Sequence, residues 1–171
     1  MDEGSQLLSV AECADLAIEE CDPLLAITAL RAGRRNVTVL PMLQRMDLLN
    51  LITREIGHPE YATQLAVETD TLFSPERRSL IVFIAHSRYY KYIYTCLMSI
   101  EDLSFDEKDK LIRAMCTAGL QDSEYIYKLH VHIGRLLSDM HQTMLYNAFL
   151  RLRDQAKPMQ LEELIEEIKS R

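Results

Sequence analysis

The chain has 171 residues, enough for one domain or two very small ones, and its 48 % hydrophobic content argues for a buried core and against intrinsic disorder. Five glycines and five prolines are few for a β-rich protein, and a formal charge of −7 argues against non-specific binding to nucleic acid or anionic lipid. No stretch approaches the roughly 18 apolar residues of a membrane span, and the N-terminus lacks the basic segment of a signal peptide.

Helix start and stop signals recur from the N-terminus onward. Ser9 and Glu12 have the three-residue spacing of a capping box and predict a helix over about 10–20. An Asp-Pro pair at 22–23 begins a second helix, which ends at Gly33.

The segment 40–57 is the most apolar and best-bounded helix in the sequence, and we expect the other helices to pack around it. Pro41 suits a first helical turn, and Gly57 suits the left-handed residue just past the end. Its apolar residues recur at steps of three and four, the period of one helix face: Leu40, Leu43, Met46, Leu49 (or Leu48), Ile52 and Ile56.

Two further segments extend the helical pattern. His58 and Pro59 open a short helix, and Ser74 begins a long one that runs to Leu97. The stretch SLIVFIA could be a buried strand, but it has no strand partner elsewhere in the chain, so we predict helix with a break near Ser87 as an option.

The C-terminal half continues in the same way. Ser104 begins a helix with a second capping box, and Gly119 ends it as the residue just past the helix. Asp122 begins another helix, and the helix after that one stops near Pro158. An amphipathic segment over about 160–170 either folds back or docks on a partner or second copy. No convincing fixed-period repeat is visible.

These patterns predict an all-α fold, a compact bundle of about seven to eight helices. Residues 1–158 form a single helical domain in this interpretation, and 159–171 a C-terminal amphipathic helix, docked or partner-binding. The expected core is supplied by Leu43, Met46, Leu49, Ile52, Leu80, Phe83, Ile84, Leu111, Ile112, Met115, Leu129, Ile133, Leu136, Leu145 and Phe149.

No pattern indicates a metal, a cofactor or a catalytic residue. His130 and His132 point about 200° apart on a helix, and neither has a histidine or acid at the four-residue step of a helical zinc site. Metalloprotease, phosphate-loop, nucleophile-elbow and dinucleotide motifs do not occur. The four cysteines lack CxxC spacing and favour reduced, mostly buried thiols in a cytosolic or nuclear protein, with two disulfides of a secreted protein as the alternative.

Basic and aromatic residues provide the candidate partner-binding surfaces. A basic loop around 31–35 suits an anionic partner or simply solvated charge, and the segment 88–94 interleaves basic residues with tyrosines. Those tyrosines can fill a core or rim, anchor a protein interface, or stack on bases. The candidate residues are Arg31, Arg34, Arg35, Arg45, Asp47, Arg88, Tyr89 and Tyr92.

The stretch LQRMDLL at 43–49 resembles the RxDL signature of death-effector domains, as found in viral inhibitors of caspase-8 activation. In that family the arginine and aspartate join a surface charge triad; here they would be Arg45 and Asp47, with Glu19 or Glu20. The segment 74–85 is similar to the opening helix of a second such domain, and 129–139 to its late helix, although a leucine replaces the motif's aspartate there. The resemblance implies a cytoplasmic adaptor or inhibitor that assembles with other death-fold proteins.

We therefore predict a non-catalytic helical protein–protein interaction module, an adaptor, inhibitor or complex subunit in apoptosis or innate signalling. Its partner is another protein or a second copy, no membrane is involved, and its location is the cytoplasm or nucleus. The alternative is an RNA- or DNA-binding protein that uses the basic loop and the tyrosine-rich helix, and steep salt dependence would distinguish it. A third option is an enzyme whose site is assembled from scattered residues, which a deep pocket with strongly perturbed pKa values would reveal.

Overall fold

The computed structural model is all-α, which confirms the predicted fold class. It describes residues 9–33, 40–55, 58–68, 74–133, 136–155 and six residues between 163 and 170. Within these ranges the chain forms nine α-helices, more than the seven to eight expected, and no strand. None of the helices so described combines the length and apolarity needed to cross a bilayer.

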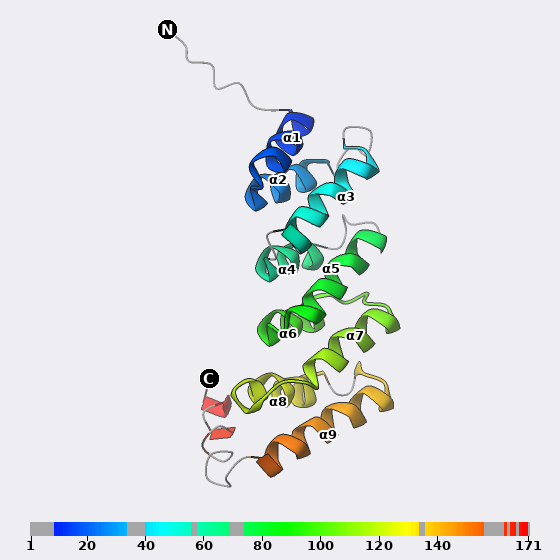
Figure 1. Cartoon of the computed structure of the whole chain (residues 1–171). Helices are drawn as coiled ribbons and strands as arrows, with labels where there is room; N and C mark the ends of the chain where they lie inside the picture. Colours follow the sequence, from blue (N-terminus) through cyan, green and yellow to red (C-terminus); the bar gives the residue numbers. More distant parts are fainter. Residues whose placement is uncertain are drawn as a thin grey trace. The chain divides into compact units, whose positions relative to one another are not determined.

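Figure 1 shows the helices in chain order, and most begin where the sequence predicts. The described residues of the C-terminal segment are also helical. The elements are α1 (Val10–Glu20), α2 (Pro23–Gly33), α3 (Met42–Asn50), the π-helical turn η1 (Leu51–Glu55), α4 (Pro59–Val67), α5 (Ser74–Ser87), α6 (Tyr90–Ser99), α7 (Phe105–Met115), the 3-10 turn η3 (Leu120–Asp122), α8 (Ser123–His132) and α9 (Asp139–Gln155).

Side-chain caps explain where several of these helices begin. The Ser9 hydroxyl accepts a hydrogen bond from the Glu12 amide at 3.2 Å, and the Glu12 carboxylate accepts one from the Ser9 amide at 2.8 Å. The same reciprocal pair forms between Ser104 and Glu107, also at 3.2 and 2.8 Å. Each pair satisfies two amide groups that would otherwise lack a partner at a helix start. Both predicted capping boxes are confirmed.

Some helices end at other residues than the sequence predicts. The long helix expected from Ser74 to Leu97 does break, because α5 ends at Ser87 and Arg88 takes a left-handed backbone with φ 59°. Gly119 is not the left-handed residue expected after α7, since its φ is −83° and α7 already ends at Met115. Gly57, the other expected stop, lies outside the described residues.

The chain divides into two compact units, unit 1 (Met1–Phe83) and unit 2 (Ile84–Arg171), and the division falls within α5. In unit 1, α1 and α2 form a hairpin on which α3 packs, and α4 packs on α2 and η1. In unit 2, α6 packs on α7, and α8 packs on α9. The single domain over 1–158 stays a prediction.

The helices repeat in pairs, although no repeat is visible in the sequence. The first helix of each pair begins at residue 10, 42, 74, 105 or 139, so that successive starts are 32, 32, 31 and 34 residues apart. In unit 1, α1 packs on α3 and α2 on α4; in unit 2, α7 packs on α9 and α6 on α8. First helices therefore pack on first helices and second on second, as in helix-pair repeats. Such packing requires only apolar residues at the contacts, so the identities of the residues need not recur.

The core agrees with the predicted residues at most positions, with two corrections. Leu43 is 82 % exposed and Leu136 is 77 % exposed, so neither contributes to the core. The buried face of α3 and η1 instead carries Arg45, Leu48, Leu49 and Ile52, and Leu43 lies about 200° around the helix from Arg45. Met46, Phe83 and Phe149 are half-buried, and the remaining predicted core residues are buried.

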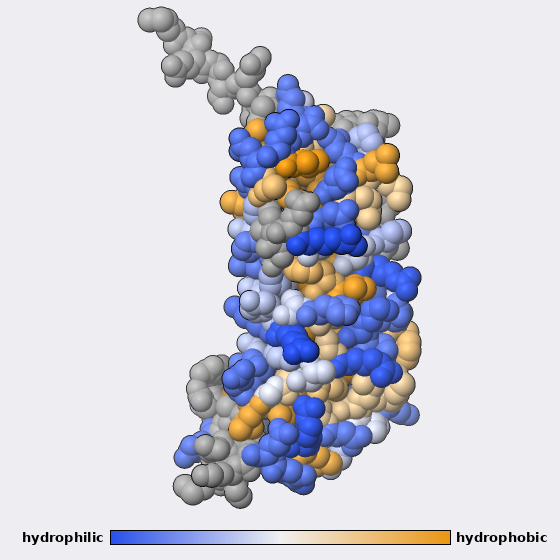
Figure 2. Space-filling view, viewed as in Figure 1, coloured by the Kyte–Doolittle hydropathy of each residue, from blue (hydrophilic) through white to orange (hydrophobic). Residues whose placement is uncertain are grey.

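The visible surface of the protein is mainly hydrophilic. Figure 2 shows one face, on which hydrophilic residues predominate and hydrophobic residues form smaller areas between them. Exposed large hydrophobic side chains in the described ranges include Leu24, Met42, Tyr89, Phe105 and Val131. Hydrophobicity on this face is therefore scattered, and charge is the more informative guide to a binding site.

A close approach in unit 1 makes Gly33 sensitive to substitution. A Cβ atom on Gly33 would lie 2.8 Å from both Cβ and Cδ2 of Leu40, which is fully buried. Overpacking should outweigh the higher helix propensity of alanine, so we expect Gly33→Ala to lower the free energy of unfolding by about 1–2 kcal/mol. Urea denaturation followed by circular dichroism measures this. The matched control is Ala32→Ser at the exposed neighbouring position, which should change stability by less than about 0.5 kcal/mol; a more stable Gly33→Ala would contradict the prediction.

Candidate functional site

The candidate residues from the first part of the chain lie in different environments. Arg31 is exposed and pairs with Glu68, its Nε donating to Oε2 at 3.0 Å. Asp47 is exposed on α3. Arg34 and Arg35 lie outside the described residues. The two described residues of this group, Arg31 and Asp47, are therefore both at the surface.

Arg45 is buried rather than exposed. Its side chain is 2 % exposed, and it donates from Nε and Nη2 to the two carboxylate oxygens of Glu76 at 2.6 and 2.7 Å. Glu76, in α5, is 3 % exposed, so this bidentate pair joins α3 to α5 inside unit 1. Sequence reasoning missed Glu76 as the partner. The burial of Arg45 could have been predicted, because Leu48 and Leu49 follow it by three and four residues and therefore share its helix face.

A basic groove in unit 2 is the strongest candidate site. It has a volume of about 440 Å³ and runs between α7 and the turn from α5 to α6. None of its lining residues is acidic. We call it the α7 groove; it is lined by Ala85, His86, Arg88, Lys110, Arg113, Ala114 and Thr117.

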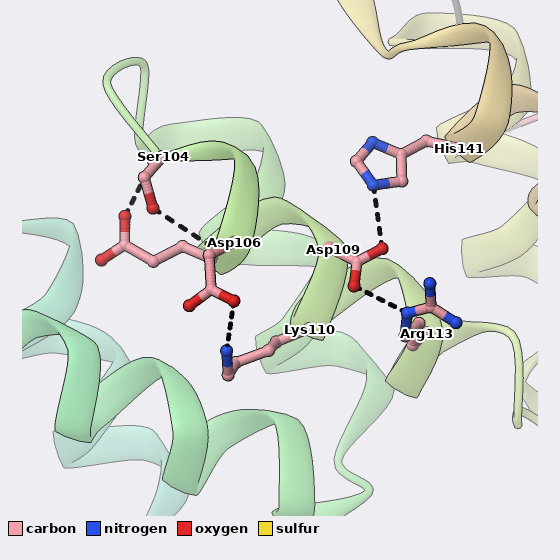
Figure 3. A network of polar contacts seen from close by, with 7 residues as sticks. Ser104, Asp106, Asp109, Lys110, Arg113 and His141 are labelled. Atoms are coloured by element: carbon pink, nitrogen blue, oxygen red, sulfur yellow. Dashed lines mark hydrogen bonds and ion pairs between the residues drawn. The ribbon is translucent and has the colours of Figure 1, made fainter.

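Two ion pairs along α7 orient the cationic side chains on this side of the groove. Lys110 Nζ lies 2.6 Å from Asp106 Oδ1, and Arg113 Nε donates to Asp109 Oδ2 at 2.6 Å (Figure 3). Both pairs have the four-residue spacing that places side chains together on a helix surface. Their acidic partners hold the stems along the helix but do not line the groove.

Asp109 also joins α7 to α9. Its Oδ1 lies 3.3 Å from Nε2 of His141, which is 1 % exposed and stacks on the ring of Phe105 with centroids 5.0 Å apart (Figure 3). The hydrogen bond from Arg113 is the main cause that lowers the pKa of the Asp109 carboxyl, and His141 contributes in the same direction against partial burial. The ionised carboxylate is therefore the form that the fold favours.

The lowered pKa of Asp109 has a consequence for stability at acid pH. Because the folded-state pKa lies below the unfolded value near 3.8, the contribution of this carboxylate is fully present above that value and is lost as pH falls through the folded pKa. We expect Asp109→Asn to melt at a lower temperature than wild type at neutral pH. The difference between the two melting temperatures should become smaller below about pH 4. Thermal unfolding from pH 7 to pH 3 measures this, with Asp154→Asn, whose side chain is 71 % exposed, as control. A deficit that is constant with pH would contradict the prediction.

The turn between α5 and α6 forms the other side of the groove. The Ser87 hydroxyl donates to the Ile84 carbonyl at 2.7 Å and accepts from the Tyr89 amide at 3.3 Å, which fixes the backbone on either side of Arg88. Arg88 is exposed, and its side chain has no hydrogen-bond or ion-pair partner among the residues that the structure describes. The Tyr90 hydroxyl lies 3.2 Å from the Thr117 hydroxyl and connects α6 to the end of the groove.

Arg88, one of the residues predicted from the sequence, belongs to this site, and the predicted Tyr89 and Tyr92 follow it closely in the chain. Arg88 lines the α7 groove, the adjacent Tyr89 is 58 % exposed, and the rings of Tyr89 and Tyr92 lie 6.1 Å apart. Sequence reasoning missed Lys110 and Arg113. Their four-residue spacing from Asp106 and Asp109 indicates a charged helix face, but it does not indicate that the turn from α5 to α6 packs beside that face. Comparisons with family models, with curated proteins and with solved structures found no match to this chain.

The cysteines and histidines of the described residues offer little chemistry. None of the four cysteines, all of which the structure describes, is in a disulfide. Burial raises the pKa of the Cys116 thiol to about 11, so that it stays protonated at neutral pH and is a poor nucleophile. In the described part of the chain, no three His, Cys, Asp or Glu side chains gather closely enough to hold a metal ion. Charge recognition is the chemistry that the α7 groove can perform.

Proposed function

We propose that the chain is a non-catalytic protein-interaction module that acts as an adaptor, an inhibitor or a complex subunit. The packing of helix pairs within each unit carries this proposal. Repeats of this kind bury a core between neighbours and leave the outer residues of successive helices for binding other proteins.

The α7 groove and the exposed Tyr89 support a specific surface for this activity. Tyrosine and arginine are the residues that most often anchor protein interfaces, because each combines a large contact area with hydrogen-bonding groups. Arg88 and Tyr89 are adjacent and exposed, and Arg88 and Arg113 line one groove. We therefore place the partner-binding surface here.

RNA or DNA binding is the second candidate function, and the same groove favours it. Four basic side chains without a lining acid suit a phosphate backbone, and Tyr89 could stack on a base. The formal charge of −7 acts against this candidate, because the rest of the surface repels a polyanion.

The resemblance to death-effector domains is a separate proposal, in which the chain is a cytoplasmic adaptor in apoptosis or innate signalling. That family presents its arginine and aspartate together on the surface. Here Asp47 is exposed, but Arg45 pairs with Glu76 in the interior. This difference is why we place the binding surface at the α7 groove rather than on α3.

A comparative pull-down from cell extract tests the proposed function. The full chain would be used as wild type, as Arg88→Glu/Tyr89→Ala, and as Asp47→Arg, with circular dichroism to show that all three fold. We expect proteins that bind the wild type and Asp47→Arg but not the groove variant, after nuclease treatment. Loss restricted to Asp47→Arg would support the death-effector proposal instead, and binding unaffected by either change would contradict both surfaces.

A further inference from the structure

We propose that the α7 groove binds a carboxylate-rich, extended segment of the partner protein. This inference rests on the proposed function and names the ligand of that site. It follows from three observations on the described residues: the charge of the groove lining, the donors that remain on its cations, and the small side chains of the lining.

The charge of the lining selects an anion. His86, Arg88, Lys110 and Arg113 contribute basic groups from both sides of the groove, and the remaining lining residues are Ala85, Ala114 and Thr117. Within the described residues, Arg88 has no anion of its own. An acidic side chain entering the groove would therefore meet an uncompensated guanidinium.

Both groove cations on α7 already pair with carboxylates. Lys110 and Arg113 each hold a carboxylate of their own helix at 2.6 Å. A guanidinium has five N–H donors, and Arg113 uses only Nε in its described hydrogen bond with Asp109. Its side chain is 58 % exposed, so that its two amino groups can reach a second carboxylate in the groove.

The small side chains of the groove favour a peptide over a nucleic acid. Ala85 and Ala114 leave room for the backbone of an extended chain to approach, and Thr117 supplies a hydroxyl beside Tyr90. A short acidic segment presents only a few charges to this groove. A nucleic acid continues as a polyanion across a surface whose net charge is negative.

The backbone of Arg88 makes this residue suitable for a test. Its φ of 59° is a left-handed conformation, which is unfavourable for a residue with a Cβ atom and normally occupied by glycine. Arg88 follows α5 directly, at the position where a left-handed residue commonly ends a helix. The other non-glycine residue with positive φ in the described ranges is Cys21 at 53°, which ends α1 in unit 1.

These two positions provide a test with a matched control. Arg88→Gly relieves the backbone and removes one groove cation, whereas Cys21→Gly relieves the backbone of unit 1 and leaves the groove lining unchanged. Both variants should fold and melt at or above the wild-type temperature. Fluorescence anisotropy would measure the binding of a labelled twelve-residue peptide of alternating glutamate and alanine, its lysine-alanine counterpart, and a twelve-nucleotide oligouridylate.

We expect the glutamate peptide to bind the wild type and Cys21→Gly equally, to bind Arg88→Gly about tenfold more weakly, and to be released by salt. The lysine peptide should not bind. Equal affinity of the glutamate peptide for wild type and Arg88→Gly, or no binding to either, would overturn the inference. Oligouridylate that binds more tightly than the peptide and depends on Arg88 would overturn it in favour of nucleic acid.

The result can be separated from the proposed function. Cellular proteins that depend on Arg88 in the pull-down, together with no binding of the glutamate peptide, would overturn the ligand class and leave the interaction module standing. Binding of the glutamate peptide that depends on Arg88, without any cellular protein in the pull-down, would support the groove chemistry and count against the proposed function.

Discussion

Replacement of Arg45 by methionine is expected to lower the free energy of unfolding by about 3–5 kcal/mol. The substitution keeps a long side chain in the interior but leaves the Glu76 carboxylate, which is 3 % exposed, without its bidentate partner. An uncompensated buried charge costs far more than the net contribution of the intact pair. Urea denaturation of wild type and variant, followed by circular dichroism at 222 nm, gives this difference.

A double-mutant cycle completes the test. Arg45→Met/Glu76→Leu removes both charges, and we expect it to recover most of the stability lost in the single variant, because hydrophobic side chains of similar volume can replace a buried pair. Arg31→Met serves as the matched control, since Arg31 pairs with Glu68 at the surface, where the two side chains are 42 % and 34 % exposed. That exposed pair should contribute about 0–1 kcal/mol. If Arg45→Met costs no more than Arg31→Met, the buried pair is not the link between α3 and α5 described above.

Truncation of Leu49 to alanine is expected to cost about 2–5 kcal/mol, because the side chain is 1 % exposed and its removal leaves a cavity in unit 1. Leu43→Ala is the matched control on the same helix. Leu43 is 82 % exposed, and leucine and alanine have similar helix propensities, so this variant should differ from wild type by less than about 0.5 kcal/mol. Thermal melting of the two variants side by side measures the contrast. Equal losses would mean that the buried face of α3 has been assigned incorrectly.

The helices could be predicted because their ends depend on residues close in the chain. Ser9 needs only Glu12, three residues away, to begin α1, and Ser104 needs only Glu107 to begin α7. The buried face of α3 was harder to predict. Leu43 and Met46 continue an apolar row, but the buried face of the helix carries Arg45. A pattern based on hydrophobicity assigns a charged residue to the surface and therefore misses this face.

The candidate site depends on contacts that no local pattern encodes. Arg45 and Glu76 are 31 residues apart. Arg88 and Arg113 line the same groove because the turn from α5 to α6 lies beside α7, although all of α6 separates the two residues in the chain. Of the tyrosine-rich segment 88–94, Arg88 lines one side of the groove. The opposite side follows from packing of helix on helix, which sequence periodicity leaves undetermined.

The pairwise packing of the helices has a consequence for how each unit folds. In unit 1, α1 and α2 are joined by two residues, and the next contacts, of α3 with α1 and α2, come from the following element of the chain. Most loops that must close during folding are therefore short, and contact order is low. We expect refolding in microseconds to milliseconds rather than seconds. A chain organised in this way can gain or lose a helix pair without rethreading the rest, so its length is open to evolutionary change.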